Sequence, residues 1–169
     1  TKVNFPFDFV LRMAVDLGRA GFRTLAIEVT IQNTGPRPMP THFGLHPYFL
    51  VPDQDRDRIR VEVDASYAYD NNSGDSGPWS GEVDLTVPSV DLHLSDLQSQ
   101  TVLLHIPGRT PRRIEMSDLF TTVVLWQSAL QDFLCVEPWS APADAFNTGL
   151  CLRTLEPGDS ISGEVVISV

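Results

Sequence analysis

The sequence is poor in basic residues. Its 12 lysines and arginines stand against 22 aspartates and glutamates, so its 169 residues carry a formal net charge of −10. Nucleic acids and anionic membrane surfaces attract basic proteins, so this balance argues against both as partners. The acidic residues are spread along the chain rather than gathered in a tail, which is typical of a solvated surface.

Long apolar runs are also missing. No stretch approaches the ~20 consecutive apolar residues that a membrane helix needs. Residues 1–9 lack the basic start and apolar run of a secretory signal. The chain does not begin with Met, so an upstream segment removed by processing stays an open alternative.

Cysteine is scarce. Cys135 and Cys151 are the two cysteines, and neither has the CxxC or Cys/His spacing of a metal site. Both occur in apolar, strand-like segments, which favours buried free thiols over a disulfide. Free thiols in turn favour a reducing, cytoplasmic location.

The rest of the composition is that of a globular protein, with 42% hydrophobic and 20% charged residues. The length suits one domain with a sizeable core. No internal repeat or linker divides the chain. We therefore expect residues 1–169 to form a single domain.

Alternation of apolar and polar residues dominates the pattern and predicts strands with one buried face. Two such segments, 7–15 and 25–31, flank a turn with two glycines and predict an antiparallel hairpin. Further short strands are expected at 41–50, 58–63, 83–87, 101–106, 112–116, 121–127, 133–137, 150–155 and 160–169. Helical turns are expected only at 117–120 and 130–133. The sequence thus predicts an all-β antiparallel sandwich or barrel.

One candidate site lies in the segment 41–49, where His42 and His46 are four residues apart. In an extended strand both side chains would face the same side. Gly44 between them would leave open space there, and Pro47 indicates a bulge or an edge that aims His46. No third ligand follows at a recognisable spacing, so we predict no metal.

The other histidines carry less information. His105 lies in an alternating strand, which favours a structural role. His93 follows Asp91 closely and stays ambiguous between a structural and a functional role.

A second candidate site is Glu137, at the end of the apolar strand 133–137 and followed by Pro138 and Trp139. A carboxyl group there is expected to be partly desolvated, which raises its pKa and suits a general base. A strand-end glutamate paired with Arg153 is the structural alternative.

Five motifs in order carry a family resemblance. They are FPFDF at 5–9, NTGPRPMP at 33–40 running into FGLHPYF at 43–49, CVEPWS at 135–140, AFNTG at 145–149 and LEPGD at 155–159. Together they resemble the aldose 1-epimerase (galactose mutarotase-like) superfamily, and more closely its hexose-6-phosphate epimerase and uncharacterised bacterial branches.

The resemblance implies an antiparallel β-sandwich that binds a sugar on one concave face. By motif position it makes His46 the acid and Glu137 the base, and it matches Asp91 to an aspartate that holds sugar hydroxyls. We add Trp139, Tyr48 and His42 as candidate sugar-binding residues, with core packing as the alternative for Tyr48.

The resemblance covers only the later part of the family domain. The earlier part normally supplies an arginine and a second histidine within an H-G motif, and no H-G dipeptide occurs here. The chain is therefore a fragment, incomplete at its N-terminal side, or a shortened relative. Half a sandwich is expected to leave unpaired edges and bare apolar faces.

The implied reaction interconverts the α and β anomers of a hexose or hexose phosphate. A base takes the proton of the anomeric hydroxyl and an acid protonates the ring oxygen. The ring then opens, the C1–C2 bond rotates, and the ring closes on the other carbonyl face. A base and an acid on opposite sides of the ring suffice, so no cofactor is predicted.

The expected partner is a small-molecule sugar, with a homodimer left open. A phosphosugar would need basic residues, for which Arg109, Arg112 and Arg113 are candidates. The alternatives to an enzyme are a non-catalytic carbohydrate-binding sandwich and a protein-interaction β-domain, because the fold hosts both kinds of function.

Overall fold

The structure is a computed structural model that describes residues 3–18, 23–128 and 131–169. Its strands are β1 (Phe9–Leu17), β2 (Thr24–Asn33), β3 (Met39–Thr41), β4 (Tyr48–Leu50), β5 (Arg60–Asp70), β6 (Ser76–Pro78), β7 (Ser89–His105), β8 (Arg112–Met116), β9 (Thr122–Ser128), β10 (Phe133–Trp139), β11 (Arg153–Leu155) and β12 (Ser160–Ser168). Its helices are the 3-10 helix η2 (Asp53–Arg58) and the single turn α1 (Ala145–Thr148), and neither was expected. None of the described helices is long and apolar enough to cross a membrane.

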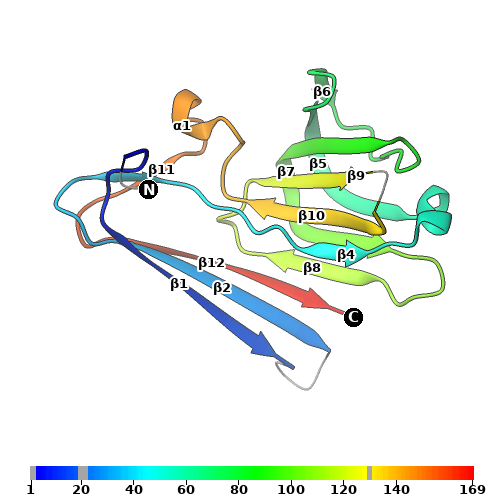
Figure 1. Cartoon of the computed structure of the whole chain (residues 1–169), viewed down its shortest axis with the longest axis horizontal. Coiled ribbons are helices and arrows are strands. Elements are labelled where there is room, and N and C mark those ends of the chain that lie inside the picture. Colours follow the sequence, from blue (N-terminus) through cyan, green and yellow to red (C-terminus); the bar gives the residue numbers. More distant parts are fainter. Residues whose placement is uncertain (1–2, 19–22, 129–130) are drawn as a thin grey trace.

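The expected all-β antiparallel architecture is confirmed. Ten strands form one sheet in the order β1-β2-β12-β8-β7-β9-β10-β4, with β5 beside β7 and β6 beside β5, while β3 and β11 form a separate pair. The pairs whose registers are resolved are antiparallel. Figure 1 shows β5, β7, β9 and β10 curled together, with β1, β2 and β12 extending away as a long arm.

The main hydrophobic core fills the curled part of the sheet. Alternate residues of β7, β9 and β10 point into it, among them Leu94, Leu125 and Val136, each fully buried. The residues between them in sequence therefore face away from this core. That second face carries the polar side chains of the candidate site.

The arm contains the predicted hairpin, in which β1 and β2 pair from Phe9↔Asn33 to Leu17↔Leu25. Part of the predicted turn, residues 19–22, lies outside the described residues. Five apolar side chains alternate along β1 and are 45% to 77% exposed: Phe9, Leu11, Met13, Val15 and Leu17. The expected bare apolar face is therefore present on β1.

Two predicted strands are wrong or too long. Residues 83–87 form no strand. The side-chain amide of Gln127 donates hydrogen bonds to the carbonyls of Leu85 (2.8 Å) and Val87 (3.1 Å), which are therefore not paired with a neighbouring strand. The segment 150–155 is a strand only from Arg153, because Cys151 has a positive φ of 54° that breaks extended backbone. Cys151 is consequently exposed rather than buried, whereas Cys135 is buried as expected, and both thiols are free.

Two further strand predictions are wrong where the chain around Gly44 meets the end of β10. The segment 41–50 is extended only at its ends, in β3 and β4, and Gly44 between them makes one isolated bridge to Trp139. Strand β10 does not stop at Glu137 but continues to Trp139, with Pro138 opposite Val123. The Pro138 carbonyl accepts a hydrogen bond from the Leu45 backbone at 3.0 Å, so the chain around Gly44 takes over as neighbour of β10 there.

Leu11 and Ile31 face each other across the β1–β2 pair, yet Leu11 is 50% exposed and Ile31 is 5% exposed. We expect Leu11→Thr to change the free energy of unfolding by less than about 0.5 kcal/mol, because it changes mainly exposed surface. Ile31→Thr is expected to cost about 2–3 kcal/mol, because it removes buried apolar atoms and buries a hydroxyl. Urea denaturation of both variants checks this, and equal losses would show that β1 is covered in solution.

Candidate active site

The site is built on the face of the sheet that points away from the core. His93 pairs with Val124, which pairs in turn with Glu137, so these three residues form one row across β7, β9 and β10. The neighbouring row joins Asp91 to Trp126 in the same way. Because directly opposite residues of antiparallel strands point to the same side, strand register alone brings these side chains together.

Glu137 is the most buried carboxylate of this face, with a residue exposure of 1%. Its Oε1 lies 3.1 Å from Nε2 of His46, and its Oε2 accepts a hydrogen bond of 3.0 Å from the indole N–H of Trp139. Burial is the main reason that the pKa of Glu137 is raised to about 7. The Trp139 hydrogen bond opposes this shift, and the negative charge of Asp91 supports it. The pKa of Glu137 is therefore that of a base poised near neutrality.

His46 comes from the irregular segment between β3 and β4. Its ring stacks on the ring of Tyr48, with 4.9 Å between the ring centroids. It is nearly perpendicular to the ring of Trp126, with 5.7 Å between the centroids. The His46 side chain is 48% exposed whereas that of Glu137 is 2% exposed. His46 thus sits at the solvent side of the pair, between Glu137 and water.

Gly44 is required for this geometry, for a reason opposite to the one expected. The space beside Gly44 is not open, because the indole of Trp139 fills it. A β-carbon at Gly44 would overlap Cδ1 of Trp139 and lie 2.9 Å from Cγ and Nε1 of the same ring. The missing side chain therefore lets Trp139 lie against the backbone and reach Glu137.

Asp91 lies next to the pair and is bound by two neighbours. Its Oδ1 is 3.0 Å from Nε2 of His93, and its Oδ2 accepts a hydrogen bond of 2.8 Å from the side-chain amide of Asn71. The backbone N–H of Asn71 also donates to the Asp91 carbonyl at 2.8 Å. Both carboxylate oxygens of Asp91 are thus held by protein groups.

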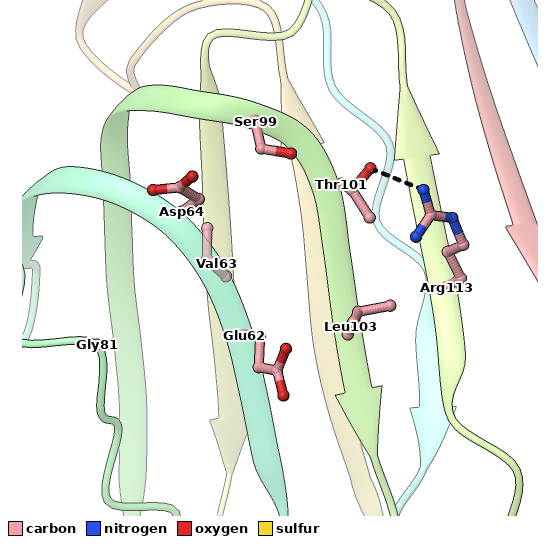
Figure 2. Close-up of a pocket in the computed structure, with 8 residues that line it drawn as sticks. All are labelled: Glu62, Val63, Asp64, Gly81, Ser99, Thr101, Leu103 and Arg113. Carbon is pink, nitrogen blue, oxygen red and sulfur yellow. Dashed lines mark hydrogen bonds between the residues drawn. The ribbon is translucent and has the colours of Figure 1, made fainter.

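These side chains line a cleft of about 230 Å³. Its strand residues are Asp91, His93, Val124, Trp126, Glu137 and Trp139, and His46, Asn71 and Ala143 complete it. A larger cleft of about 470 Å³, shown in Figure 2, contains Glu62, Asp64 and Arg113. The two clefts share no lining residue.

The three arginines proposed for a phosphate do not line the site cleft. Arg113 belongs to the cleft of Figure 2, where it contacts Thr101 and Glu115. Arg109 donates to the Leu50 carbonyl, and Arg112 to the Thr110 carbonyl. The ionisable groups that line the site cleft are Asp91, Glu137, His46 and His93.

Four of the six candidate residues, His46, Glu137, Asp91 and Trp139, line one cleft. Tyr48 is 59% exposed, so the expectation of core packing is wrong; it supports the ring of His46 instead. His42 does not face the same cleft as His46, because the segment between them is not a continuous strand. Its ring packs on Phe146 at 4.8 Å, and burial lowers the pKa of His42. Sugar binding by His42 and Tyr48 stays a prediction.

Sequence reasoning missed Trp126 and Asn71 and left His93 undecided. Trp126 and Asn71 reach the site through strand pairing and a turn, and neither has a local sequence signal. His93 did have one: it lies two residues after Asp91, so on a strand both must face the same side.

A metal ion could be held by His46, Cys135 and Glu137, whose ligand atoms lie within 4.8 Å of one another. Burial, together with the negative charge of Glu137, raises the pKa of the Cys135 thiol to about 12. A thiol with that pKa keeps its proton at neutral pH and is a poor ligand in that form. The absence of a metal stays a prediction.

The comparisons with known proteins agree with this geometry. The family model described as aldose 1-epimerase matches residues 1–168. The chain belongs to the aldose 1-epimerase family. No curated protein sequence matches it.

Solved structures place the chain in the galactose mutarotase-like fold of this family. Slr1438 from Synechocystis sp. PCC 6803 is similar over 97% of this chain and 55% of its own, at 34% identity and a TM-score of 0.89. A galactose mutarotase-like protein from Clostridium acetobutylicum covers 98% of this chain and 57% of its own, at 20% identity and a TM-score of 0.79. A galactose mutarotase-like protein from Lactobacillus casei covers 97% of this chain and 64% of its own, at 20% identity and a TM-score of 0.74.

The expected galactose mutarotase-like β-sandwich fold is therefore confirmed. The chain spans between 55% and 64% of the length of these three structures. What the longer members of the family do as whole proteins consequently enters only as a proposal for this chain.

The contact between Gly44 and Trp139 gives the first prediction for this site. Gly44→Ala is expected to cost about 1–3 kcal/mol of stability, because the added methyl group displaces the indole. It should also break the Trp139–Glu137 hydrogen bond, which the indole N–H resonance reports by NMR. The matched control is Gly77→Ala, whose added methyl group has no atom within 4 Å. An unshifted indole resonance in Gly44→Ala would contradict the proposed contact.

The raised pKa of Glu137 predicts how stability depends on pH. The unfolded chain ionises near the ordinary value of 4.5, whereas the folded protein keeps the proton until about pH 7. The folded state therefore binds more protons within this window, and its stability falls as pH rises through it. The difference between 4.5 and about 7 corresponds to about 3 kcal/mol.

Glu137→Gln removes this cost. The free energy of unfolding of the variant minus that of the original protein should therefore be larger at pH 8 than at pH 5, by up to about 3 kcal/mol. Urea denaturation at both pH values measures the gain. Glu82→Gln, at an exposed carboxylate, is the control and should show no such gain. Parallel pH profiles for Glu137→Gln and the original protein would contradict the raised pKa.

Proposed function

We propose that the chain carries the acid–base pair of an aldose 1-epimerase and interconverts the anomers of a neutral aldose. The observation that carries the proposal is the contact of 3.1 Å between His46 Nε2 and Glu137 Oε1 at the wall of a small cleft. A carboxylate with a pKa of about 7 is a base suited to neutral pH, and the adjacent imidazole is the candidate acid.

The contact changes one detail of the expected mechanism. The acid and the base are adjacent rather than on opposite sides of the sugar ring. Adjacent groups are sufficient, because the anomeric oxygen and the ring oxygen are both bonded to C1. Glu137 takes the proton of the anomeric hydroxyl, and His46 protonates the ring oxygen as the C1–O5 bond breaks.

The reaction needs Glu137 ionised and His46 protonated. In this reactive state the pair carries one proton, which is bound to His46. After rotation about C1–C2 the roles reverse: His46 takes the proton back from O5 and Glu137 returns its proton to the new anomeric oxygen. The pair ends in the state in which it began.

The cleft supports a single neutral sugar as substrate. Its volume of about 230 Å³ suits one sugar ring, and a neighbouring cleft of about 320 Å³ shares Asn71, His93 and Ala143 with it. Trp126 and Trp139 offer apolar surfaces to a sugar ring, and the carboxylates of Asp91 and Glu137 repel a phosphate group. The sugar as partner and the cytoplasmic location are part of this proposal, and a homodimer stays a prediction.

Exchange NMR of glucose and galactose tests the proposal, because it measures anomer interconversion directly. His46→Ala and Glu137→Gln are each expected to lower the catalysed rate about 10²- to 10⁴-fold, the usual contribution of a positioned acid or base. The rate of the original protein should rise with pH up to about 7, where Glu137 ionises. Glucose 6-phosphate is expected to be a poorer substrate.

His105→Ala is the matched control, because His105 is also paired with a carboxylate, Glu62 at 2.9 Å, but does not line the cleft. It should leave the rate unchanged. Sugar binding without anomer exchange would contradict catalysis and support a carbohydrate-binding module. Absence of both would favour a protein-interaction domain.

A further inference from the structure

His93 faces the same cleft as the acid–base pair, but the mechanism above does not use it. It is 8% exposed and lines the cleft together with Glu137. The two residues belong to one row, with Val124 of the intervening strand between them. Neighbouring strands are about 4.8 Å apart, so the backbones at His93 and Glu137 are about 10 Å apart. Val124 lies between them and lines the bottom of the cleft.

The orientation of the His93 ring is fixed from two sides. Its plane is nearly perpendicular to the rings of Trp139, at 5.3 Å, and Tyr69, at 6.0 Å. Tyr69 is also the residue paired with His93 on β5. The ring is therefore held between two aromatic side chains.

Hydrogen bonding also fixes which nitrogen of His93 is free. Nε2 is 3.0 Å from the Asp91 carboxylate, which can only accept, so Nε2 carries the proton. Asn71 donates to the other oxygen of Asp91 at 2.8 Å and holds that carboxylate in place. In the neutral imidazole Nδ1 is then an acceptor, and it is the ring nitrogen left for a ligand.

We propose that Nδ1 of His93 accepts a hydrogen bond from a sugar hydroxyl across the ring from C1, on C3 or C4, and that Asp91 acts as the residue that positions it. The proposal rests on the proposed function, because it assumes that C1 lies at Glu137. Because the backbones at Glu137 and His93 are about 10 Å apart, we expect one pyranose ring to fit between their side chains, along the Trp139 indole that contacts both. From the sequence, Asp91 is expected to bind sugar hydroxyls directly. In this proposal Asp91 instead orients His93, which binds the hydroxyl.

The proposal makes His93 a determinant of specificity. A hydroxyl across the ring from C1 distinguishes sugars that differ in configuration at C3 or C4. A buried acceptor that loses its donor carries a desolvation cost, so a sugar without this hydroxyl should be a poorer substrate.

The test combines His93→Phe with deoxy sugars. Phenylalanine keeps a ring between Tyr69 and Trp139 but has no nitrogen. In the original protein, either 3-deoxyglucose or 4-deoxyglucose is expected to show kcat/KM about tenfold or more below glucose, as for the loss of one hydrogen bond to a buried group. His93→Phe should lower kcat/KM for glucose by a similar factor and leave that deoxy sugar unaffected.

His93→Asn provides a conservative rescue, because its amide oxygen occupies a place close to that of Nδ1. It should restore part of the preference for glucose over the deoxy sugar. His105→Phe, on the same strand but outside the cleft, is the control and should change neither sugar. A merely structural role of His93 predicts the same loss for glucose and both deoxy sugars, which would overturn the proposal.

Nitrogen NMR of His93 provides a second readout that does not depend on turnover or on the folding of a variant. In the original protein Nδ1 should resonate as an unprotonated nitrogen and shift when glucose is added. In Asp91→Ala the fixed tautomer should be lost. An Nδ1 that is protonated, or that does not respond to bound glucose, overturns the proposal even if the protein is an active epimerase. A protein that binds no sugar overturns the proposed function as well.

Discussion

The site depends on one constraint, which is that the Glu137 carboxyl group on β10 has almost no access to water. A buried carboxylate needs hydrogen-bond donors, and strand neighbours such as Val124 cannot supply them. Trp139 donates a hydrogen bond to Oε2, and His46 lies within ion-pair distance of Oε1, at 3.1 Å. The same burial raises the pKa of the group to about 7. Burial therefore sets both the partners of Glu137 and its strength as a base.

The partners impose further requirements on the chain around them. The Trp139 indole can lie beside Glu137 only because Gly44 has no side chain. The backbone near Gly44 pairs with the end of β10, and this pairing brings the following residues, including His46, over the carboxyl group. One irregular segment thus makes room for Trp139 and delivers the acid. Asp91 adds a negative charge that raises the pKa of Glu137 and also holds His93.

Much of this could be predicted from local sequence. The hairpin of β1 and β2 follows from strict alternation, which one strand expresses without any knowledge of its partners. His46 and Glu137 were identified from their segments and from ordered motifs. The predictions failed where a distant group overrode the local pattern: Gln127 holds residues 83–87 by their carbonyls, and the segment 41–50 follows β10 instead of forming a strand.

The sequence by itself determined the all-β fold, the family and the identity of the acid–base pair, because alternation and ordered motifs are properties of neighbouring residues. The tertiary structure decided which residues share the cleft. Trp126, Asn71 and His93 join Glu137 through strand register and turns, and His42 is excluded from the cleft by the path of the chain. It also decided the charge properties of Glu137. Register, burial and pKa depend on which strands become neighbours, and no single segment contains that information.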